Sequence, residues 1–449
     1  MIVMKFGGTS VGDTQAIEAS CRTVRENLDK KPFVVVSALA GVTDNLLRVG
    51  RLAVTNRLSE AFAMADSLEK RHAKLLPVAG YFIKLRELLQ ALSQIGVFTL
   101  RSQDLIAAYG EDMSSQIFAA RLREFGIEAI HIDARSYIAT DDNFGQAQPL
   151  FDVTYRQFQR IHGILDTVKK RVVVMGGFVG ATQNGVTTTL GRGGSDYSAV
   201  LAAAAMGAKE IQIWTDVSGV MTADPKIEAK ARTIKHLSFA EASELANFGA
   251  KVLHPKTIEP AMEKNIPVYI LNSWLPAAPG TKVTRDTISC QNIVKSIACK
   301  RDVSVVTVMT SRMLGAIGFL SALFGILKNI GVSVDMVSTS EVSVSFTLDD
   351  PGRGGGVTDA LRRPEWGVSL ENNLALVCLV GSDMKFSPGV AARAFGSIRD
   401  LHVRMISHGA SMTNLAFLVR KEYLEEAVRR LHTEFFSEFD PEVFEEPGI

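Results

Sequence analysis

The fold of this chain is decided by one stretch, Thr187-Thr188-Thr189-Leu190-Gly191-Arg192-Gly193-Gly194-Ser195-Asp196. An apolar run at residues 172–178 precedes it and is predicted to be a buried strand, while residues 197–205, rich in strong helix formers, follow it. A loop with three glycines and several hydroxyl side chains therefore leads into a helix N-terminus, which favours an anion. Arg192 adds a cation that can bind a carboxylate through two parallel hydrogen bonds. Glycine-rich turns also occur for steric reasons alone, so both alternatives stay open here.

The composition is that of an ordinary globular protein. The chain has 449 residues, 47% hydrophobic and 22% charged, which is enough for two or three domains and a large core. The formal net charge is +1, from 49 basic and 48 acidic residues, so we expect neither nucleic acid nor a membrane as partner. Four scattered cysteines, no signal-peptide pattern and no bilayer-length apolar run predict a cytoplasmic protein.

Short apolar runs alternate with helical segments through the first two thirds of the chain. The runs predicted as strands are residues 2–6, 33–38, 129–133, 172–178, 211–216 and 266–271, with a helical region between residues 45 and 125. This alternation indicates an α/β fold in which a mostly parallel sheet is covered by helices on both faces. Ligands bind such sheets beyond the carboxyl ends of the strands. We therefore expect the loops that follow these strands to converge on one cleft, namely residues 7–12, 40–44, 176–196 and 215–225.

Charged side chains in these loops are candidates for binding an anionic substrate. Lys5 stands at the tip of the first strand, just before Gly7-Gly8, where a phosphate can approach the backbone closely. Its position differs from that of a Walker A lysine, which follows the glycines, and an isolated strand-end lysine is more often solvated. Lys251 is a second such cation. Glu111 could bind the ammonium group of an amino acid while Arg192 binds its carboxylate, although a surface helix position is the alternative for Glu111.

Other polar groups in the chain carry weaker signals. Thr215-Asp216 end a strand and precede a loop that could contact a nucleotide, although its Asp224-Pro225 is also an ordinary turn. His254 has no partner at metal-ligand spacing, and neither a Ser-His-Asp nor a Cys-His set is evident. The ligands of any metal are therefore left unassigned.

Four motifs, taken together, resemble the aspartokinases of the amino-acid kinase fold: Lys5–Ser10, Thr187–Asp196, Trp214–Asp216 and Phe248–Pro255. Their order and spacing make the match specific over essentially the whole chain. The resemblance implies transfer of the γ-phosphoryl group of ATP, accompanied by Mg²⁺, to the side-chain carboxylate of L-aspartate. Such a carboxylate is already ionised at neutral pH, so the reaction needs alignment and charge neutralisation rather than a general base. A non-catalytic amino-acid sensor and a kinase of another small acid, such as glutamate, are the alternatives.

The resemblance also implies roles for individual residues. The catalytic set would be Lys5 and Lys251 on the phosphates, with Asp196 orienting the lysines. The residues expected around aspartate are Thr43, Glu111, Phe178, Arg192, Gly193 and Ser195. The residues expected around the nucleotide are Lys5, Gly7, Gly8, Thr215, Asp216, Met221, Lys226, Lys251 and Val252. Many relatives have tyrosine in place of Met221 and arginine in place of Lys226, which leaves the stacking and charge on the nucleotide side open.

The last third of the chain repeats itself. Phe324-Gly325 recurs as Phe395-Gly396, and at the same offset Phe346 matches Phe417. Two copies of a βαββ unit explain this pattern, and chance matching of apolar positions is the alternative. The units resemble ACT modules, which sense amino acids and can be threaded one through the other. The predicted domains are a kinase domain at residues 1–290, a first ACT module at 297–372 and a second at 373–449.

Only the first repeat offers carboxylates to a cationic ligand. Asp335 and Glu341 lie in a segment that resembles the lysine site of lysine-sensitive aspartokinases, where they would face the two ammonium groups of L-lysine; otherwise they are simply solvated. The residues expected at this site are Met313, Gly318, Phe319, Leu320, Ser333, Val334, Asp335, Thr339, Ser340 and Glu341. Because ACT modules commonly pair across subunits, we expect a homodimer or a dimer of dimers. The chain ends at Ile449, so we expect a monofunctional enzyme without a homoserine dehydrogenase half.

Overall fold

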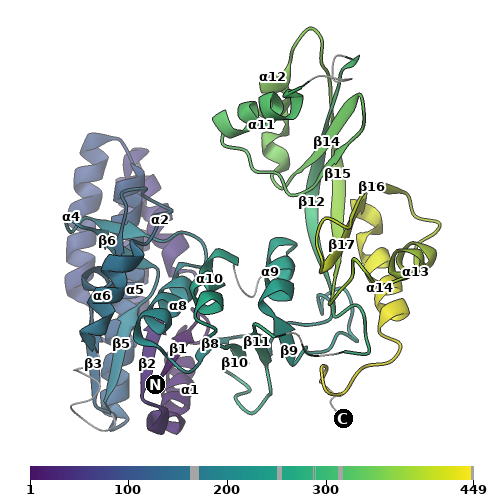
Figure 1. Ribbon diagram of the computed structural model, residues 1–449. Coiled ribbons are helices and arrows are strands. Elements are labelled where there is room, and N and C mark those ends of the chain that lie inside the picture. Colours follow the sequence, from purple (N-terminus) through teal and green to yellow (C-terminus); the bar gives the residue numbers. More distant parts are fainter. Residues whose placement is uncertain (162–170, 250–254, 287, 289, 312–316, 446–449) are drawn as a thin grey trace. The chain divides into compact units, whose positions relative to one another are not determined.

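The computed structural model describes residues 1–161, 171–249, 255–286, 288, 290–311 and 317–445, which form two compact units (Figure 1). Unit 1 comprises Met1–Val220, Lys235–Phe239 and the described part of residues 252–286. Unit 2 comprises Met221–Ile234 and the described parts of residues 240–251 and 287–449. Among the described residues, no helix combines the length and apolar character that a membrane span requires.

Unit 1 is built on an eight-stranded sheet with the strand order β3-β5-β2-β1-β8-β10-β11-β9. Neighbouring strands are parallel except for β10 and β11. Every residue of β1, β2 and β5 is buried, as expected for strands covered on both faces. The strands are β1 (Ile2–Phe6), β2 (Pro32–Val36), β3 (Ala129–Ile132), β5 (Val172–Gly176), β8 (Ile211–Thr215), β9 (His236–Ser238), β10 (Val268–Asn272) and β11 (Thr281–Thr284). The predicted mostly parallel α/β sheet is confirmed.

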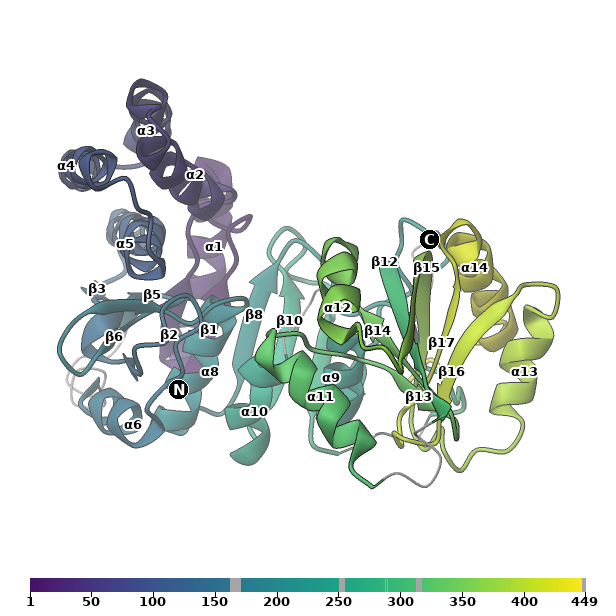
Figure 2. The same cartoon turned by 90° about the horizontal axis from the view of Figure 1, so that it is seen from above.

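Helices cover both faces of this sheet, and strand alternation decides which side chain meets which layer. Figure 2 shows α1–α5 on one side and α6, α8 and α10 on the other. Met4 and Phe6 belong to the core formed with α1, α2 and α5, so Lys5 between them points to the α8 side. The helices are α1 (Thr14–Glu26), α2 (Val42–Val54), α3 (Leu58–Ala73), α4 (Ala79–Ile95), α5 (Leu100–Glu124), α6 (Phe151–Gln159), α8 (Gly194–Met206) and α10 (Pro255–Glu263).

A small sheet of three strands, in the order β4-β6-β7, accompanies the large one. Its strands are β4 (Ala139–Thr140), β6 (Val179–Thr182) and β7 (Thr187–Thr189). The predicted strand at residues 172–178 is shorter, because Phe178 takes a left-handed backbone conformation (φ 64°) that ends β5 at Gly176. The following helix α8 begins at Gly194, three residues earlier than residue 197, so the last glycine of the loop is already helical.

Unit 2 contains a six-stranded sheet in the order β13-β14-β12-β15-β17-β16. Its two long central strands pair antiparallel along their length, and each contributes to both repeats. The strands are β12 (Ser296–Met309), β13 (Val337–Thr339), β14 (Ser343–Leu348), β15 (Gly367–Val380), β16 (Val403–His408) and β17 (Asn414–Arg420). The helices are α9 (Phe239–Asn247), α11 (Phe319–Asn329), α12 (Gly354–Leu361), α13 (Val390–Ser397) and α14 (Leu424–Phe435).

The order strand, helix, strand, strand, helix occurs twice in unit 2, from β12 to α12 and from β15 to α14. Phe346 on β14 and Phe417 on β17 are both fully buried, at the equivalent positions that the sequence repeat predicts. The duplication of one βαββ-containing unit is therefore visible in the fold. The residue boundaries of the domains stay predictions.

Candidate active site

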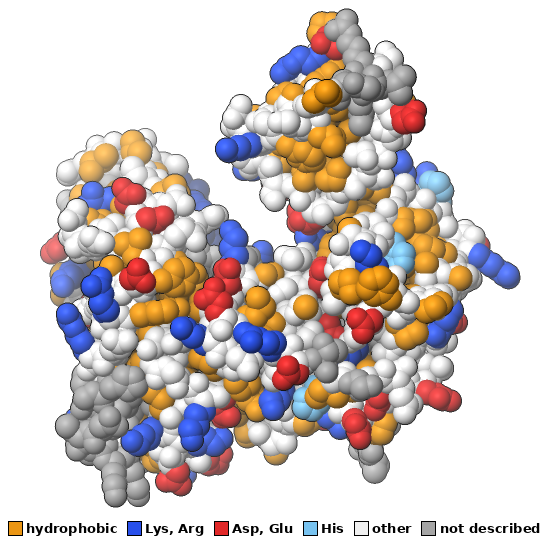
Figure 3. Space-filling view, viewed as in Figure 1, with side chains coloured by type: hydrophobic (Ala, Val, Ile, Leu, Met, Phe, Trp, Pro, Cys, Tyr) orange, Lys and Arg blue, Asp and Glu red, His pale blue; other side chains and the backbone are white. Residues whose placement is uncertain are grey.

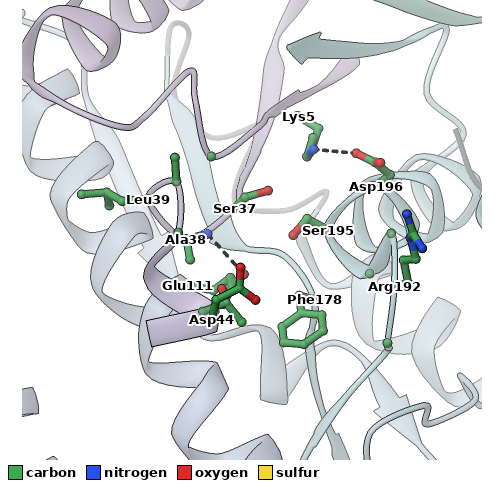
Figure 4. A pocket seen from close by; sticks show the side chains of 17 residues that line it. Lys5, Ser37, Ala38, Leu39, Asp44, Glu111, Phe178, Arg192, Ser195 and Asp196 are labelled. Atoms are coloured by element: carbon green, nitrogen blue, oxygen red, sulfur yellow. Dashed lines mark hydrogen bonds and ion pairs between the residues drawn. The ribbon is translucent and has the colours of Figure 1, made fainter. Parts of the chain in front are cut away.

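A cavity of about 370 Å³ lies in unit 1, at the carboxyl ends of β1, β2 and β5 (Figure 4). Separate parts of the chain form its wall: β1 with the loop after it, the loop after β2 with the start of α2, helix α5, the turn after β5, and the glycine-rich loop that enters α8. This convergence is what a parallel sheet produces, because the carboxyl ends of its strands meet at one edge. The lining residues are Lys5, Gly8, Ser37, Ala38, Leu39, Ala40, Gly41, Thr43, Asp44, Glu111, Phe178, Gly191, Arg192, Gly193, Gly194, Ser195 and Asp196.

Lys5 and Asp196 form an ion pair at the wall of this cavity. The Lys5 Nζ atom lies 2.7 Å from Asp196 Oδ1, and the two side chains are only 11% and 16% exposed. Asp196 stands in the first turn of α8, where the helix dipole also favours a carboxylate. The pair therefore fixes the ammonium group of Lys5 in place before any substrate arrives.

The glycines of the loop allow a close approach that no other residue permits. Gly191 and Gly193 have φ values of 74° and 73°, and Gly193 caps α8. A Cβ on Gly194 would lie 2.7 Å from the Phe178 ring. The first turn of α8 therefore lines the cavity, and a helix N-terminus at this place favours an anion. Arg192 is exposed and makes no ion pair with any described residue, so its guanidinium group is available to a ligand.

Phe178 is held in its left-handed conformation by one buried hydroxyl. The Phe178 N–H donates to Ser198 Oγ at 2.9 Å, and that hydroxyl donates to Gly194 O at 2.9 Å. A non-glycine residue at positive φ is uncommon and tends to occur at functional sites. Ser198 thus joins the Phe178 turn to the first turn of α8.

Glu111 contributes to the cavity a carboxylate in which only one oxygen atom accepts a hydrogen bond from the described residues. The residue is 3% exposed; its Oε1 accepts a hydrogen bond from Ala38 N at 3.2 Å, whereas Oε2 has no hydrogen-bond partner among the described residues. Burial raises the pKa of this carboxyl group to about 8, although the Ala38 hydrogen bond opposes the shift. A cation bound beside Oε2 would remove the cost of burying the ionised form. Figure 4 shows Glu111 and Arg192 on opposite sides of the cavity.

All the residues that the sequence predicts around the substrate aspartate line this cavity: Thr43, Glu111, Phe178, Arg192, Gly193 and Ser195. Lys5, Gly8 and Asp196 join them. The sequence reasoning missed several lining positions, namely Ser37, Ala38, Leu39, Ala40, Gly41, Asp44, Gly191 and Gly194. Most of these belong to loops that the sequence did single out, so a complete list of loop residues would have found them.

The residues predicted to bind the nucleotide are divided among three parts of the chain. Gly7 follows β1 and donates its N–H to Trp214 O at 2.9 Å, which places it beside the end of β8. Thr215 ends β8, and its hydroxyl donates to Asp216 Oδ1 at 3.2 Å. Met221 and Lys226 belong to unit 2, whereas Lys251 and Val252 lie outside the described residues. The nucleotide site therefore stays a prediction.

The predicted effector residues of unit 2 surround the start of α11 and the edge strand β13. Gly318, with φ 87°, caps α11, which Phe319 and Leu320 begin; Met313 lies outside the described residues. Ser333 and Val334 precede β13, Thr339 ends it, and Ser340 follows it.

The two carboxylates of this site differ in their surroundings. Asp335 Oδ2 lies 2.5 Å from Lys300 Nζ, which also contacts Asp349 Oδ2 at 2.7 Å. Burial alone would lower the pKa of Lys300, but the hydrogen bonds that its ammonium group donates to these two carboxylates outweigh burial and raise it. Glu341 is exposed and forms no ion pair with the described residues. The chain's own Lys300 thus occupies the position next to Asp335 where the sequence predicts a ligand ammonium group.

Within the described ranges, no three His, Cys, Asp or Glu side chains are grouped so that they could hold a metal ion.

Comparison with known proteins agrees with this geometry. Residues 1–272 match the amino acid kinase family and residues 377–435 match the ACT domain. The fold and the cavity thus define an ATP-dependent kinase of the amino-acid kinase class.

Individual relatives narrow this class. The chain is 38% identical to lysine-sensitive aspartokinase 3 of Escherichia coli, over 97% of this chain and 99% of that protein. It is 37% identical to the chloroplastic aspartokinase 1 of Arabidopsis thaliana, over 98% of this chain and 80% of that one. The crystal structure of E. coli aspartokinase III with aspartate and ADP has a TM-score of 0.86 at 36% identity, covering 97% of this chain and 100% of that one. The complex of E. coli aspartokinase III with lysine and aspartate has a TM-score of 0.80. The chain belongs to the aspartokinases of the amino acid kinase family.

Proposed function

We propose that this chain is an aspartate kinase, which transfers the γ-phosphoryl group of ATP to the side-chain carboxylate of L-aspartate. The observation that carries the proposal is the buried Glu111 carboxylate, whose Oε2 has no hydrogen-bond partner among the described residues and which faces Arg192 across the cavity. One anionic and one cationic group on opposite walls suit the ammonium and α-carboxylate groups of an amino acid. The aspartokinase relatives named above support aspartate as that amino acid.

Catalysis by this site depends on position and charge. With its ammonium group on Glu111 and its α-carboxylate on Arg192, aspartate would direct its side-chain carboxylate toward Lys5 and the first turn of α8. That carboxylate is already ionised and attacks without a general base. Lys5 and the N–H groups of α8 then stabilise the negative charge of the transferred phosphoryl group. Lys251 would add a second cation on the phosphates.

Mg²⁺ would enter this site together with ATP. Asp196, a carboxylate expected to lie near the phosphates, is already paired with Lys5, so we assign no protein ligand to the metal. The metal supplies further neutralisation of the phosphate charge when it is bound.

Regulation by L-lysine at the first ACT repeat and assembly into a homodimer or a dimer of dimers complete the proposal, with the cytoplasm as the location. A relative crystallised with lysine supports the effector. Lysine inhibits only if it binds a less active state more tightly than the active one.

An ADP-release assay with aspartate or glutamate as acceptor tests the proposal. We expect ADP release with aspartate and ATP, and a lower kcat/KM with glutamate. A higher kcat/KM with glutamate would assign the chain to the alternative acid. Aspartate binding without ADP release would identify a non-catalytic sensor.

A further inference from the structure

The hydroxyl groups of the three threonines that precede the glycine-rich loop all form hydrogen bonds within the protein. The Thr187 hydroxyl accepts a hydrogen bond from Arg135 Nε at 2.9 Å, and the same guanidinium group pairs with Asp112 of α5 at 2.8 Å. The Thr188 hydroxyl lies 2.7 Å from the hydroxyl of Thr140 on β4. These side chains are therefore not free to contact a ligand, contrary to what a loop rich in hydroxyl groups suggests.

The third threonine leads to a buried carboxylate that has no part in the proposed chemistry. Asp104, on α5, is 2% exposed. Its Oδ1 accepts from Thr189 Oγ1 at 2.7 Å, and its Oδ2 accepts from Thr189 N at 3.0 Å and Gly145 N at 2.9 Å. These three hydrogen bonds offset the free-energy cost of burying the Asp104 carboxylate. They also join α5 to the last residue of β7.

The Gly145 contact extends this connection to the substrate loop. Gly191 lies so close to the Gly145 segment that a Cβ on Gly191 would stand 3.1 Å from Gly145 O. Ala147 N also donates to Thr189 O at 2.9 Å. Asp104 therefore holds the residue that leads into the turn bearing Arg192, and also the segment that packs against this turn.

Glu111 stands on the same helix, two turns beyond Asp104. A rigid helix thus carries the group expected to bind the ammonium of the substrate and also the carboxylate that anchors the loop bearing Arg192. We propose that Asp104 is a positioning residue that sets the separation between Glu111 and Arg192, and thereby selects an amino acid of the length of aspartate over one with an additional methylene group. This inference rests on the proposed function of the site.

The test measures kcat and KM for aspartate and for glutamate in Asp104→Ala, Asp104→Asn and the parent enzyme. We expect Asp104→Ala to lower kcat/KM for aspartate about a hundredfold, the scale of a misplacement of about 1 Å. The ratio of kcat/KM for aspartate to that for glutamate should fall at least about tenfold, since one methylene group is worth about 10–200-fold in a fixed pocket. Asp104→Asn should stay close to the parent, because its carbonyl oxygen still accepts from both N–H groups and Thr189 can accept from its amide.

Two adjacent threonines provide the matched control. Thr189→Val removes the hydroxyl group that donates to Asp104 and should lower the aspartate-to-glutamate ratio several-fold. Thr188→Val removes an equally buried hydroxyl group that connects β7 to β4 rather than to α5, and should leave the ratio unchanged.

Each outcome decides a separate question. A ratio that stays at the parent value in both Asp104→Ala and Thr189→Val, with only the melting temperature lowered, would overturn the inference. An equal fall of the ratio in Thr188→Val would overturn it as well. If Asp104→Ala does not fold, Thr189→Val, whose aspartate-to-glutamate ratio should fall, still tests the inference. A parent enzyme that releases no ADP with aspartate would instead refute the proposed function.

Discussion

Carboxylates that we expect to bind an amino acid occur in both units, but in opposite surroundings. Glu111 in unit 1 is 3% exposed, with no cation beside Oε2 among the described residues. The Asp335 side chain in unit 2 is 29% exposed and is already paired with Lys300. A ligand ammonium group therefore stabilises the ionised form of Glu111, which burial disfavours, whereas at Asp335 it replaces an existing ion pair. The first arrangement favours a substrate that must be bound selectively, and the second favours an effector that must bind and leave as its concentration changes.

Figure 3 shows the face of the molecule seen in Figure 1, with charged and apolar side chains interspersed over both units. This agrees with the nearly balanced charge of the sequence. Recognition of a charged amino acid therefore depends on local pairs of charges rather than on a large field of one sign.

The largest effect should come from the fixed cation of unit 1. Lys5→Ala removes one preorganised charge from the transferred phosphoryl group, so kcat should fall about 10²–10³-fold. Steady-state ADP release measures the effect. Lys30→Ala is the control, because Lys30 is 53% exposed and pairs with Glu210 at the surface; its turnover should equal that of the parent. Near-normal turnover in Lys5→Ala would remove Lys5 from the mechanism.

The next largest effect should come from the buried carboxylate. Glu111→Gln keeps the shape of the side chain but removes the charge, so kcat/KM for aspartate should fall about a hundredfold. In the parent, the KM for aspartate should decrease as the pH rises through about 8, because the free enzyme must ionise Glu111 before the ammonium group binds. In Glu111→Gln this dependence should vanish. A parent KM that is flat from pH 6.5 to 8.5 would contradict the assigned role.

A smaller effect is expected at the exposed carboxylates of unit 2. Glu341→Ala should raise the lysine concentration for half-inhibition about tenfold, the worth of one charge-assisted hydrogen bond. Lys300→Met should lower that concentration, because Asp335 then no longer has an internal partner. Glu371→Ala, which breaks the surface pair with Arg404, is the control and should change nothing. Unchanged inhibition after removal of both Asp335 and Glu341 would refute this site.

Much of unit 1 could be predicted from the sequence because its signals are local. Strands such as Ile2–Phe6 are continuous apolar runs, and their order with helices implies a parallel sheet. From that sheet it follows that the loops after β1, β2 and β5 converge, whereas the roles of Lys5 and Asp196 in one site were implied by the resemblance to the aspartokinases. The repeat in unit 2 was visible for the same reason, since Phe346 and Phe417 occupy equivalent buried positions.

The remaining features depend on contacts that no local pattern encodes. In the sequence, nothing distinguishes Asp104 from an ordinary residue of a helix. Its hydrogen bonds with Thr189 and Gly145 become evident only in the fold. The ion pair of Lys300 with Asp335 likewise joins two segments that are distant along the chain. The burial of Glu111, which raises its pKa, depends on how closely α5 packs: a Cβ on Gly110 of this helix would lie 2.8 Å from Ala38 Cβ.

Proton release on aspartate binding tests most directly the claim that a buried carboxylate awaits the ammonium group. Titration calorimetry at pH 7, in buffers of different ionisation enthalpy, measures the number of protons exchanged. With a free-enzyme pKa of about 8, Glu111 is mostly protonated at pH 7, so binding should release most of one proton, and Glu111→Gln should release none. Aspartate binding without proton release in the parent enzyme, or the same release in Glu111→Gln, would contradict the account.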